Sequence, residues 1–364
     1  MKIAILGTRG IPNNHGGFEQ FAEYFSVYLS QQEHEVYVYN SHNHPYQEKS
    51  YKGVKIIHIF DPEYKMGTAG QFLYDLKCIL DSRKRKFDVI LQLGYTSSSI
   101  WHWLMPKSSV IITNMDGMEW KRSKYSSIVK QFLKYAEKLA VKHSNFLISD
   151  SIGIQEYISK AYHKDSEFIA YGASVFNDAN DSILSDYKVK KNQFSIIIAR
   201  MEPENNIETI VKGFYNSKTT QDLLIFGSLN DYGKKLQATY SSDKRIRFLG
   251  ANYNQNDLNN LRYYSRYYFH GHSVGGTNPS LLEAMASNTL IVANNNVFNK
   301  SILGVDAVYF DSSEDIKSIL DIDTLFNEKS NFSQNNINKI NQLYSWEKIN
   351  AAYTGYILKT LNSN

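Results

Sequence analysis

Short, continuous runs of apolar residues alternate with amphipathic helical patterns along almost the whole chain, and this alternation restricts the possible folds most. A strand without polar residues is typical of a parallel sheet that is buried on both faces. Such strands are expected at 3–6, 36–39, 54–60, 89–93, 110–113 and 146–148, and again at 195–199, 223–226, 245–249, 267–270, 290–293 and 308–310. The pattern predicts an α/β fold of doubly wound, Rossmann-like sheets with right-handed crossovers.

The strands form two series, separated by a break in the pattern. At 364 residues the chain exceeds the size that one hydrophobic core usually organises, so two domains are expected. Residues 173–193 are rich in Asn, Asp and Ser and are predicted to be a linker. The predicted domains are therefore 1–172 and 194–344. A helical pattern over 345–364 is expected to pack back towards the first domain.

Charge and cysteine content restrict the classes of function. The 40 basic and 36 acidic residues give a net charge of only +4, so no nucleic-acid partner is expected. Cys78 is the single cysteine, which excludes an internal disulfide and fits a reducing, cytoplasmic compartment. No segment is long and apolar enough to span a bilayer, and the first residues do not resemble a signal peptide. His, Cys and carboxylate residues do not cluster with metal-ligand spacing, so no metal or other cofactor is expected.

Residues 120–143 hold a local concentration of basic charge, with seven Lys or Arg against one Glu. Four lysines recur at intervals of four and are expected on one helix face: Lys130, Lys134, Lys138 and Lys142. A separate apolar stripe is expected from Ile128, Phe132, Ala136 and Leu139. The pattern fits an ordinary amphipathic helix packed on the sheet. It also fits a peripheral helix that meets anionic lipid headgroups weakly, on the inner face of a bacterial plasma membrane.

The segment 270–286, HGHSVGGTNPSLLEAMA, joins a predicted strand to a predicted helix. Pro279 suits the first helical position and Asn278 the cap before it. A helix start offers unpaired N–H groups and a positive dipole end, and glycines let a phosphate approach the backbone. The residues expected to bind an anion are Gly275, Gly276, Thr277 and Asn278. Alternatively, Ser280 and Glu283 have the spacing of a capping box, which would make Glu283 purely structural.

Further candidates follow other predicted strands. Gly16 and Gly17 precede a helix and are predicted either to cradle a second phosphate or to form a turn that needs positive φ. Asp116, Arg200 and Gly227 stand at the carboxyl ends of strands, where parallel sheets bind their ligands. An arginine at such a position suits bidentate phosphate binding. An Asp-Gly pair such as the one at Asp116 is also common in simple turns.

The phrases GTRGIPNNHGGFEQFAEY, NMDGMEWKR, ARMEPENNIE and HGHSVGGTNPSLLEAM together resemble the family 4 glycosyltransferases of the GT-B fold, over nearly the full chain. Within that family they resemble bacterial rhamnosyltransferases of capsule and surface-polysaccharide assembly. The family signature has two Glu residues separated by seven others; Glu283 matches the second, whereas Gly275 stands at the first. Arg200 matches the phosphate arginine, and Asn205 replaces the lysine that usually follows it.

The resemblance implies a retaining, metal-independent transfer from a nucleotide sugar, with the donor bound to the C-terminal domain and the acceptor to the N-terminal one. Arg200, Gly16, Gly17 and the 276–278 backbone would hold the diphosphate, and Glu283 the ribose hydroxyls. Asp116 falls near a sugar-contacting position. Catalytic roles are therefore expected for Asp116, Arg200 and Glu283, and donor binding is also expected to involve Asn205, Gly227, Gly275 and Thr277.

The donor hypothesis rests on Gly275, because a missing carboxylate suits a sugar that lacks a matching hydroxyl. The expected donor is dTDP-β-L-rhamnose, and the expected acceptor is a lipid-diphosphate-linked saccharide. Three alternatives stay open at this point. They are a UDP-hexose-dependent transferase such as one using UDP-glucose, a nucleotide-sugar-binding protein that does not transfer, and a sugar-nucleotide epimerase on the same fold.

Overall fold

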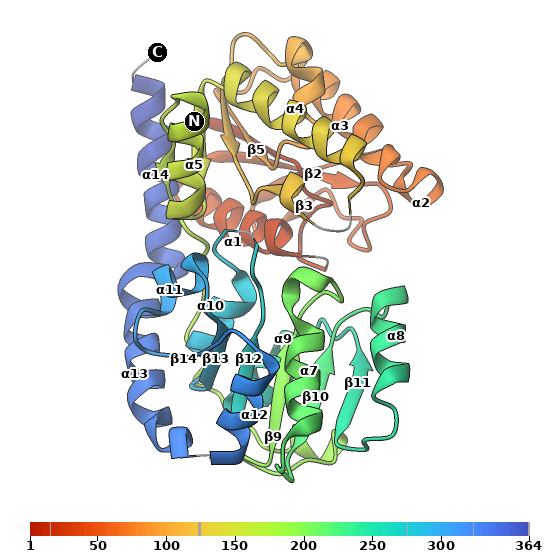
Figure 1. The fold of residues 1–364 in the computed structure, drawn as a ribbon. Helices are drawn as coiled ribbons and strands as arrows, with labels where there is room; N and C mark the ends of the chain where they lie inside the picture. Colours follow the sequence, from red (N-terminus) through yellow and green to blue (C-terminus); the bar gives the residue numbers. More distant parts are fainter. Residues whose placement is uncertain (15, 123–124, 275, 323, 363–364) are drawn as a thin grey trace. The chain divides into compact units, whose positions relative to one another are not determined.

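The computed structural model describes residues 1–14, 16–122, 125–274, 276–322 and 324–362 of the chain. It contains two compact units (Figure 1). The first consists of 1–121, 125–171 and the C-terminal segment from Trp346. The second consists mainly of Gly172–Ser345. Each unit is built around its own largely parallel sheet, which confirms the predicted α/β, doubly wound fold.

The first unit has an eight-stranded sheet in the order β3-β4-β2-β1-β5-β6-β7-β8, parallel except for the β3–β4 pair. Its strands are β1 (Lys2–Leu6), β2 (Glu35–Ser41), β3 (Ser50–Tyr51), β4 (Val54–Ile59), β5 (Val89–Leu93), β6 (Val110–Asn114), β7 (Phe146–Ser149) and β8 (Glu167–Phe168). Its helices are α1 (Gly17–Gln31), α2 (Glu63–Met66), α3 (Ala69–Ser82), α4 (Ser127–His143), α5 (Ile152–Tyr162) and α14 (Trp346–Asn362), with short 3₁₀ turns η1 (Ser99–Leu104) and η2 (Glu119–Lys121). The predicted apolar runs coincide with the long central strands.

The second unit has a six-stranded sheet in the order β11-β10-β9-β12-β13-β14, parallel throughout. Its strands are β9 (Phe194–Ile198), β10 (Asp222–Phe226), β11 (Ile246–Gly250), β12 (Tyr267–His270), β13 (Leu290–Asn294) and β14 (Val308–Phe310). Its helices are α6 (Ile183–Asp186), α7 (Ile207–Asn216), α8 (Asp231–Thr239), α9 (Gln255–Tyr264), α10 (Pro279–Ala286), α11 (Val297–Leu303), α12 (Ser313–Ile322) and α13 (Lys329–Lys339). Shorter helical turns are η3 (Pro203–Asn205), η4 (Thr324–Glu328) and η5 (Ile340–Tyr344). Successive strands are added on one side of β9 up to β11 and on its other side from β12, and this reversal of strand order is the topological switch point, where doubly wound sheets bind their ligands.

The C-terminal helix α14 packs on the first unit, beside α1 (Figure 1). Tyr353 lies fully buried against the rings of Phe21 and Phe25, and its hydroxyl accepts a hydrogen bond of 2.8 Å from Asn114 Nδ2. Trp346 stacks on Tyr24 with ring centroids 4.3 Å apart. The last helix therefore completes the core of the unit that begins the chain.

Helix α4 differs in one respect from its prediction. Its buried side is built from Leu133, Ala136, Leu139 and Ala140. Ile128, expected on the apolar stripe, is instead 80% exposed. The reason is its place in the first turn, since the side chains that contact the rest of the unit begin one turn later. Lys134, Lys138 and Lys142 are exposed as expected, and Lys130 is half-buried.

Candidate functional site

The loop from β12 to α10 is a capped helix start of the predicted kind. Asn278 is the N-cap residue, its Oδ1 accepts a hydrogen bond of 2.9 Å from Ser280 N, and Pro279 occupies the first turn. Thr277 is buried beside the cap. Gly275 lies outside the described residues. The local sequence therefore determines where α10 begins, because both residue types prefer these positions.

Glu283 is held by an ion pair and not by a capping box. Its Oε2 accepts a hydrogen bond of 2.6 Å from Nη2 of Arg262 on α9, whose side chain is 1% exposed. Ser280 sits inside the helix, and its hydroxyl bonds to the hydroxyl of Tyr268 and to the Ile198 carbonyl. The capping-box alternative is therefore wrong. Arg262 was missed because nothing in the local sequence connects it to a residue 21 positions later.

Arg200 follows β9 and is exposed, with no side-chain partner among the residues that the structure describes. The loop behind it is fixed by Asn205, which is buried and whose Nδ2 donates to the Arg200 carbonyl at 2.8 Å. Asn205, which the sequence resemblance set against a lysine, thus shapes the loop. Its part in donor binding stays a prediction, and the structure shows it supporting the backbone of Arg200.

The loops after β9 and β12 are tied to each other. Asn206 Nδ2 donates to the Gly271 carbonyl at 2.8 Å, while Ser273 donates to the Glu204 carbonyl from its backbone N at 3.0 Å and its hydroxyl at 2.8 Å. These bonds join segments about 65 residues apart in sequence and hold them at one edge of the sheet. They bring Arg200 to the same edge as the start of α10.

Gly227 follows β10 at the same edge and is required by packing. A Cβ on this residue would lie 2.1 Å from the carbonyl oxygen of Ala199, so only glycine lets the two chain segments approach. Its backbone N donates to the Gly250 carbonyl at 2.9 Å. The structure therefore gives Gly227 a packing role, and its role in donor binding stays a prediction.

Two histidines of this edge were not singled out from the sequence. The rings of His270 and His272 stack with centroids 4.4 Å apart, and His270 in turn stacks on Tyr268. Burial, followed by the neighbouring His272, lowers the pKa of His270 well below its usual value. Burial, followed by the charge of Arg200, lowers the pKa of His272 to about 3. Both rings are therefore neutral near pH 7. The signal in the sequence is the spacing of 268, 270 and 272, which places all three on one face of an extended chain.

The remaining candidates belong to the first unit. Gly16 is the residue before α1 with an extended backbone (φ −167°), and Gly17 begins that helix. Positive φ occurs instead at Gly7 and Gly10, earlier in the same loop. The turn alternative is therefore wrong for Gly16, whereas a phosphate-binding role stays a prediction.

Asp116 follows β6 and is half-buried. Burial, followed by the negative charge of Asp116, raises the pKa of Asp150 well above its usual value. The segment after Asp116 is anchored by the buried carboxylate of Glu137, which accepts hydrogen bonds from Trp120 Nε1 and from the hydroxyls of Tyr95, Tyr157 and Tyr162. The segment that follows Asp116 is thus tied to α4 through the bond from Trp120 to Glu137.

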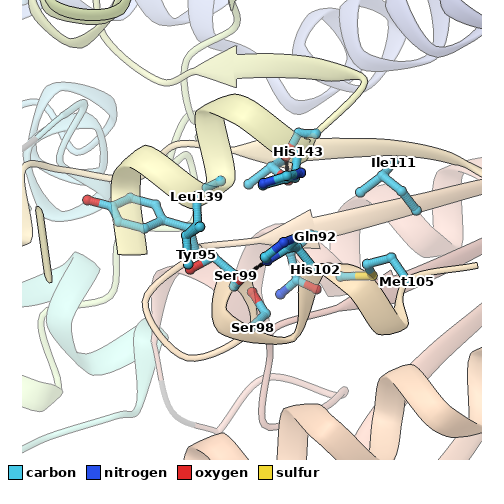
Figure 2. A pocket seen from close by; sticks show the side chains of 12 residues that line it. Gln92, Tyr95, Ser98, Ser99, His102, Met105, Ile111, Leu139 and His143 are labelled. Atoms are coloured by element: carbon cyan, nitrogen blue, oxygen red, sulfur yellow. Dashed lines mark hydrogen bonds between the residues drawn. The ribbon is translucent and has the colours of Figure 1, made fainter. Parts of the chain in front are cut away.

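A pocket in the first unit lies between β5, β6, η1 and α4, with an empty volume of about 300 Å³ (Figure 2). His102 and His143 line it with stacked rings, centroids 3.7 Å apart. None of the predicted site residues lines this pocket. The predicted residues fall into two groups: Arg200, Asn205, Gly227, Gly276, Thr277, Asn278 and Glu283 belong to the second unit, and Gly16, Gly17 and Asp116 belong to the first.

Metal-binding clusters and membrane-spanning helices were both sought among the described residues. In those ranges, no three or more His, Cys, Asp or Glu side chains come together as a metal site would need. Within the same ranges, no helix has both the length and the apolar character needed to cross a membrane.

Two families match the chain in succession. Residues 1–174 match a domain of unknown function (DUF1972), and residues 181–339 match the glycosyl transferases group 1. The O-antigen chain mannosyltransferase RfbU of Salmonella typhimurium is 25% identical over 194 residues. That alignment covers 52% of this chain and 53% of the mannosyltransferase, so the chain spans about half the length of this relative.

Solved structures resemble the chain over its whole length. Anabaena HepE, in complex with UDP and glucose, has a TM-score of 0.77 at 16% identity, with full coverage of both chains. Sucrose-phosphate synthase from Thermosynechococcus elongatus has a TM-score of 0.79 at 13% identity, again with full coverage of both. At this level of identity the likeness establishes the fold, which is GT-B.

Proposed function

We propose that this chain, a group 1 glycosyltransferase through its residues 181–339, transfers a sugar from a nucleotide-sugar donor to a hydroxyl of a saccharide acceptor. One observation supports this more than any other. Within the matched region, an exposed arginine, a capped helix start and a carboxylate fixed by a buried arginine share one sheet edge. These are the groups that a nucleoside diphosphate requires.

Each group has a distinct role in the proposed site. Arg200 binds the diphosphate through its guanidinium, and the backbone N–H groups at the start of α10 add donors and a positive dipole end. Glu283 accepts hydrogen bonds from the ribose hydroxyls. Its pairing with Arg262 holds the carboxylate in one orientation, since Arg262 is buried and itself hydrogen-bonded to Asn259 at 2.8 Å.

The proposed reaction retains the configuration of the sugar and uses no metal. The acceptor hydroxyl attacks the anomeric carbon on the face from which the diphosphate leaves. The bond from the anomeric carbon to the diphosphate oxygen breaks, and the hydroxyl proton passes to that oxygen. Arg200 and the amides of α10 stabilise the charge that develops on the leaving group, which is where preorganised donors accelerate a reaction most.

The proposed pathway is surface-polysaccharide synthesis, as in O-antigen or capsule assembly, with a lipid-diphosphate-linked saccharide as acceptor. The O-antigen mannosyltransferase relative supports the pathway, and the sequence resemblance to rhamnosyltransferases supports dTDP-β-L-rhamnose as donor. The competing donor is a UDP-hexose, which the UDP and glucose bound to HepE favour. The donor-binding residues proposed here all belong to the second unit.

The acceptor lipid suggests a membrane-facing surface on the first unit. Beside the exposed lysines of α4 stand exposed apolar side chains: Ile128 (80%), Tyr135 (56%) and, on the adjoining η1 turn, Trp103 (59%). Lysines attract anionic headgroups, and apolar and aromatic side chains insert at the boundary of the acyl chains. We therefore propose peripheral binding through α4 and η1 at the inner face of the membrane.

A donor comparison tests the proposal. Purified protein is incubated with dTDP-β-L-rhamnose, UDP-glucose or GDP-mannose, with and without a lipid-diphosphate-linked glucose, and products are identified by mass. A deoxyhexose increment that requires the acceptor supports the full proposal. A hexose increment overturns the rhamnose assignment and retains the glycosyltransferase. Isomerised donor without acceptor identifies an epimerase, and binding without any product identifies a protein that does not transfer.

A further inference from the structure

A column of rings starts on β12 and continues into the loop that follows it, towards the proposed donor site. Tyr268, His270 and His272 lie at alternate positions, so their side chains share one face, while Tyr267 and Phe269 point into the hydrophobic core. The guanidinium of Arg262 stands over the Tyr268 ring, 5.9 Å from its centroid. The stack therefore begins at the arginine that holds Glu283 and ends at His272.

His272 lies beside Arg200. Strands β9 and β12 pair with Ile197 opposite Phe269, and the two residues each follow three positions later. The proximity is also electrostatic, because the charge of Arg200 contributes to the low pKa of His272. The backbone of His272 is fixed, since its carbonyl accepts hydrogen bonds from Asn296 Nδ2 at 2.9 Å and Asn299 Nδ2 at 3.0 Å. The imidazole is therefore held next to the group proposed to bind the diphosphate.

The two rings present polar atoms that the described part of the chain leaves unbonded. Both nitrogens of His270 and Nδ1 of His272 are buried without a hydrogen-bond partner among those residues. A buried polar group without a partner is destabilising, so such a cluster is characteristic of a site completed by a ligand or by ordered water. The packing of the sheet does not explain these three atoms, and His272, the outer of the two rings, is the one that faces the charge of Arg200.

We propose that His272 recognises the transferred sugar, with its neutral imidazole hydrogen-bonding a sugar hydroxyl and His270 stacked behind it. This inference rests on the proposed function. A hydroxyl both donates and accepts, as a neutral imidazole does, whereas a diphosphate only accepts and is better matched by Arg200 and backbone amides. His272 thereby contributes to the choice of sugar and not to the binding of the nucleotide.

The test compares nucleotides with nucleotide sugars. The affinities of UDP, dTDP and GDP, and of UDP-glucose, dTDP-β-L-rhamnose and GDP-mannose, are measured by calorimetry for wild type and for His272→Phe. Phenylalanine keeps a ring for the stack and removes both nitrogens. We expect the variant to bind the preferred nucleotide sugar ten- to a hundredfold more weakly, the scale of one buried hydrogen bond left unmade, and the free nucleotide within about twofold of wild type.

Two further variants make the result specific. His272→Asn keeps a donor and an acceptor and is expected to recover part of the lost affinity. His143→Phe changes the other stacked histidine pair, in the first unit, and is expected to leave both affinities unchanged. Circular dichroism and melting curves of each variant establish that the fold is intact.

Several outcomes would overturn the assignment. Equal weakening for nucleotide and nucleotide sugar would place His272 on the diphosphate. Unchanged affinities in a folded His272→Phe would remove it from the site. A lowered melting temperature with no recovery in His272→Asn would make it structural. If wild type binds the nucleotides but none of the nucleotide sugars, or none of the six compounds, the proposed function itself fails, which is a different result from failure of the variant alone.

Discussion

The Arg262–Glu283 pair gives the sharpest prediction, because its two members differ in exposure. The Arg262 side chain is 1% exposed and that of Glu283 is 16% exposed, at an N–O distance of 2.6 Å. Glu283→Leu leaves a buried guanidinium without its counter-charge, which we expect to cost about 3–5 kcal/mol. Arg262→Met leaves a carboxylate that water still reaches in part, so a smaller cost of about 1–3 kcal/mol is expected.

The double variant separates charge burial from packing. Arg262→Met combined with Glu283→Leu removes both charges and keeps similar volumes, and such replacements are often neutral for stability. We therefore expect the double variant to be more stable than Glu283→Leu alone, with clear non-additivity. For a unit of this size the loss in Glu283→Leu corresponds to a fall in melting temperature of roughly 6–20 °C.

The assay is calorimetric melting of the wild type, the two single variants and the double variant, together with a measurement of the transfer activity of each. Glu156→Leu serves as the matched control, because its pair with Lys160 is exposed on α5 and its loss is expected to leave the melting temperature unchanged. The double variant should melt near wild type and yet have lost at least ~100-fold of its activity, since the ribose contact is gone. Additive losses in the double variant would refute the buried-pair argument. A double variant with normal turnover would refute the role of Glu283 in donor binding.

Three further predictions concern separate parts of the chain. Arg200→Ala should lower transfer by at least ~100-fold without changing the melting temperature, because the side chain is exposed and serves the diphosphate; near-normal turnover would contradict this. Burial raises the pKa of Asp75 to about 6, although Ser97 donates a hydrogen bond of 2.5 Å to its carboxylate. The ionisation of Asp75 therefore destabilises the fold as pH rises from about 4 to 6, by at most roughly 3 kcal/mol. Asp75→Asn should therefore raise the melting temperature at pH 7.5 and leave it nearly unchanged at pH 4, whereas an equal effect at both pH values would exclude a titration origin. Flotation with anionic vesicles at low salt should capture wild type and not the triple variant in which Lys130, Lys134 and Lys138 become Gln, because each lysine contributes about 1 kcal/mol to binding. The triple variant should keep its activity on a soluble acceptor. A wild type that does not bind the vesicles would show that these lysines form only a solvated surface.

Sequence patterns alone were sufficient for the features that depend on near neighbours. The apolar runs predicted the central strands of both sheets, because a strand buried on both faces excludes polar residues wherever it lies. Asn278 and Pro279 predicted the start of α10 for the same reason, since capping acts within a few residues. The short strands β3 and β8 have two residues each and carry no pattern of their own.

Only the tertiary structure decided what the polar residues do. The spacing of Ser280 and Glu283 was compatible with a capping box, yet Glu283 pairs with Arg262 from another helix. Asn205 stood where a ligand-binding lysine was expected, and its amide holds the carbonyl of Arg200. The rings of His270 and His272 became significant only when their unbonded buried nitrogens and the place of His272 beside Arg200 were known. Local periodicity indicates which side of a helix or strand is buried. The partner of a polar side chain depends instead on how segments distant in sequence pack together, and no local sequence pattern indicates that partner.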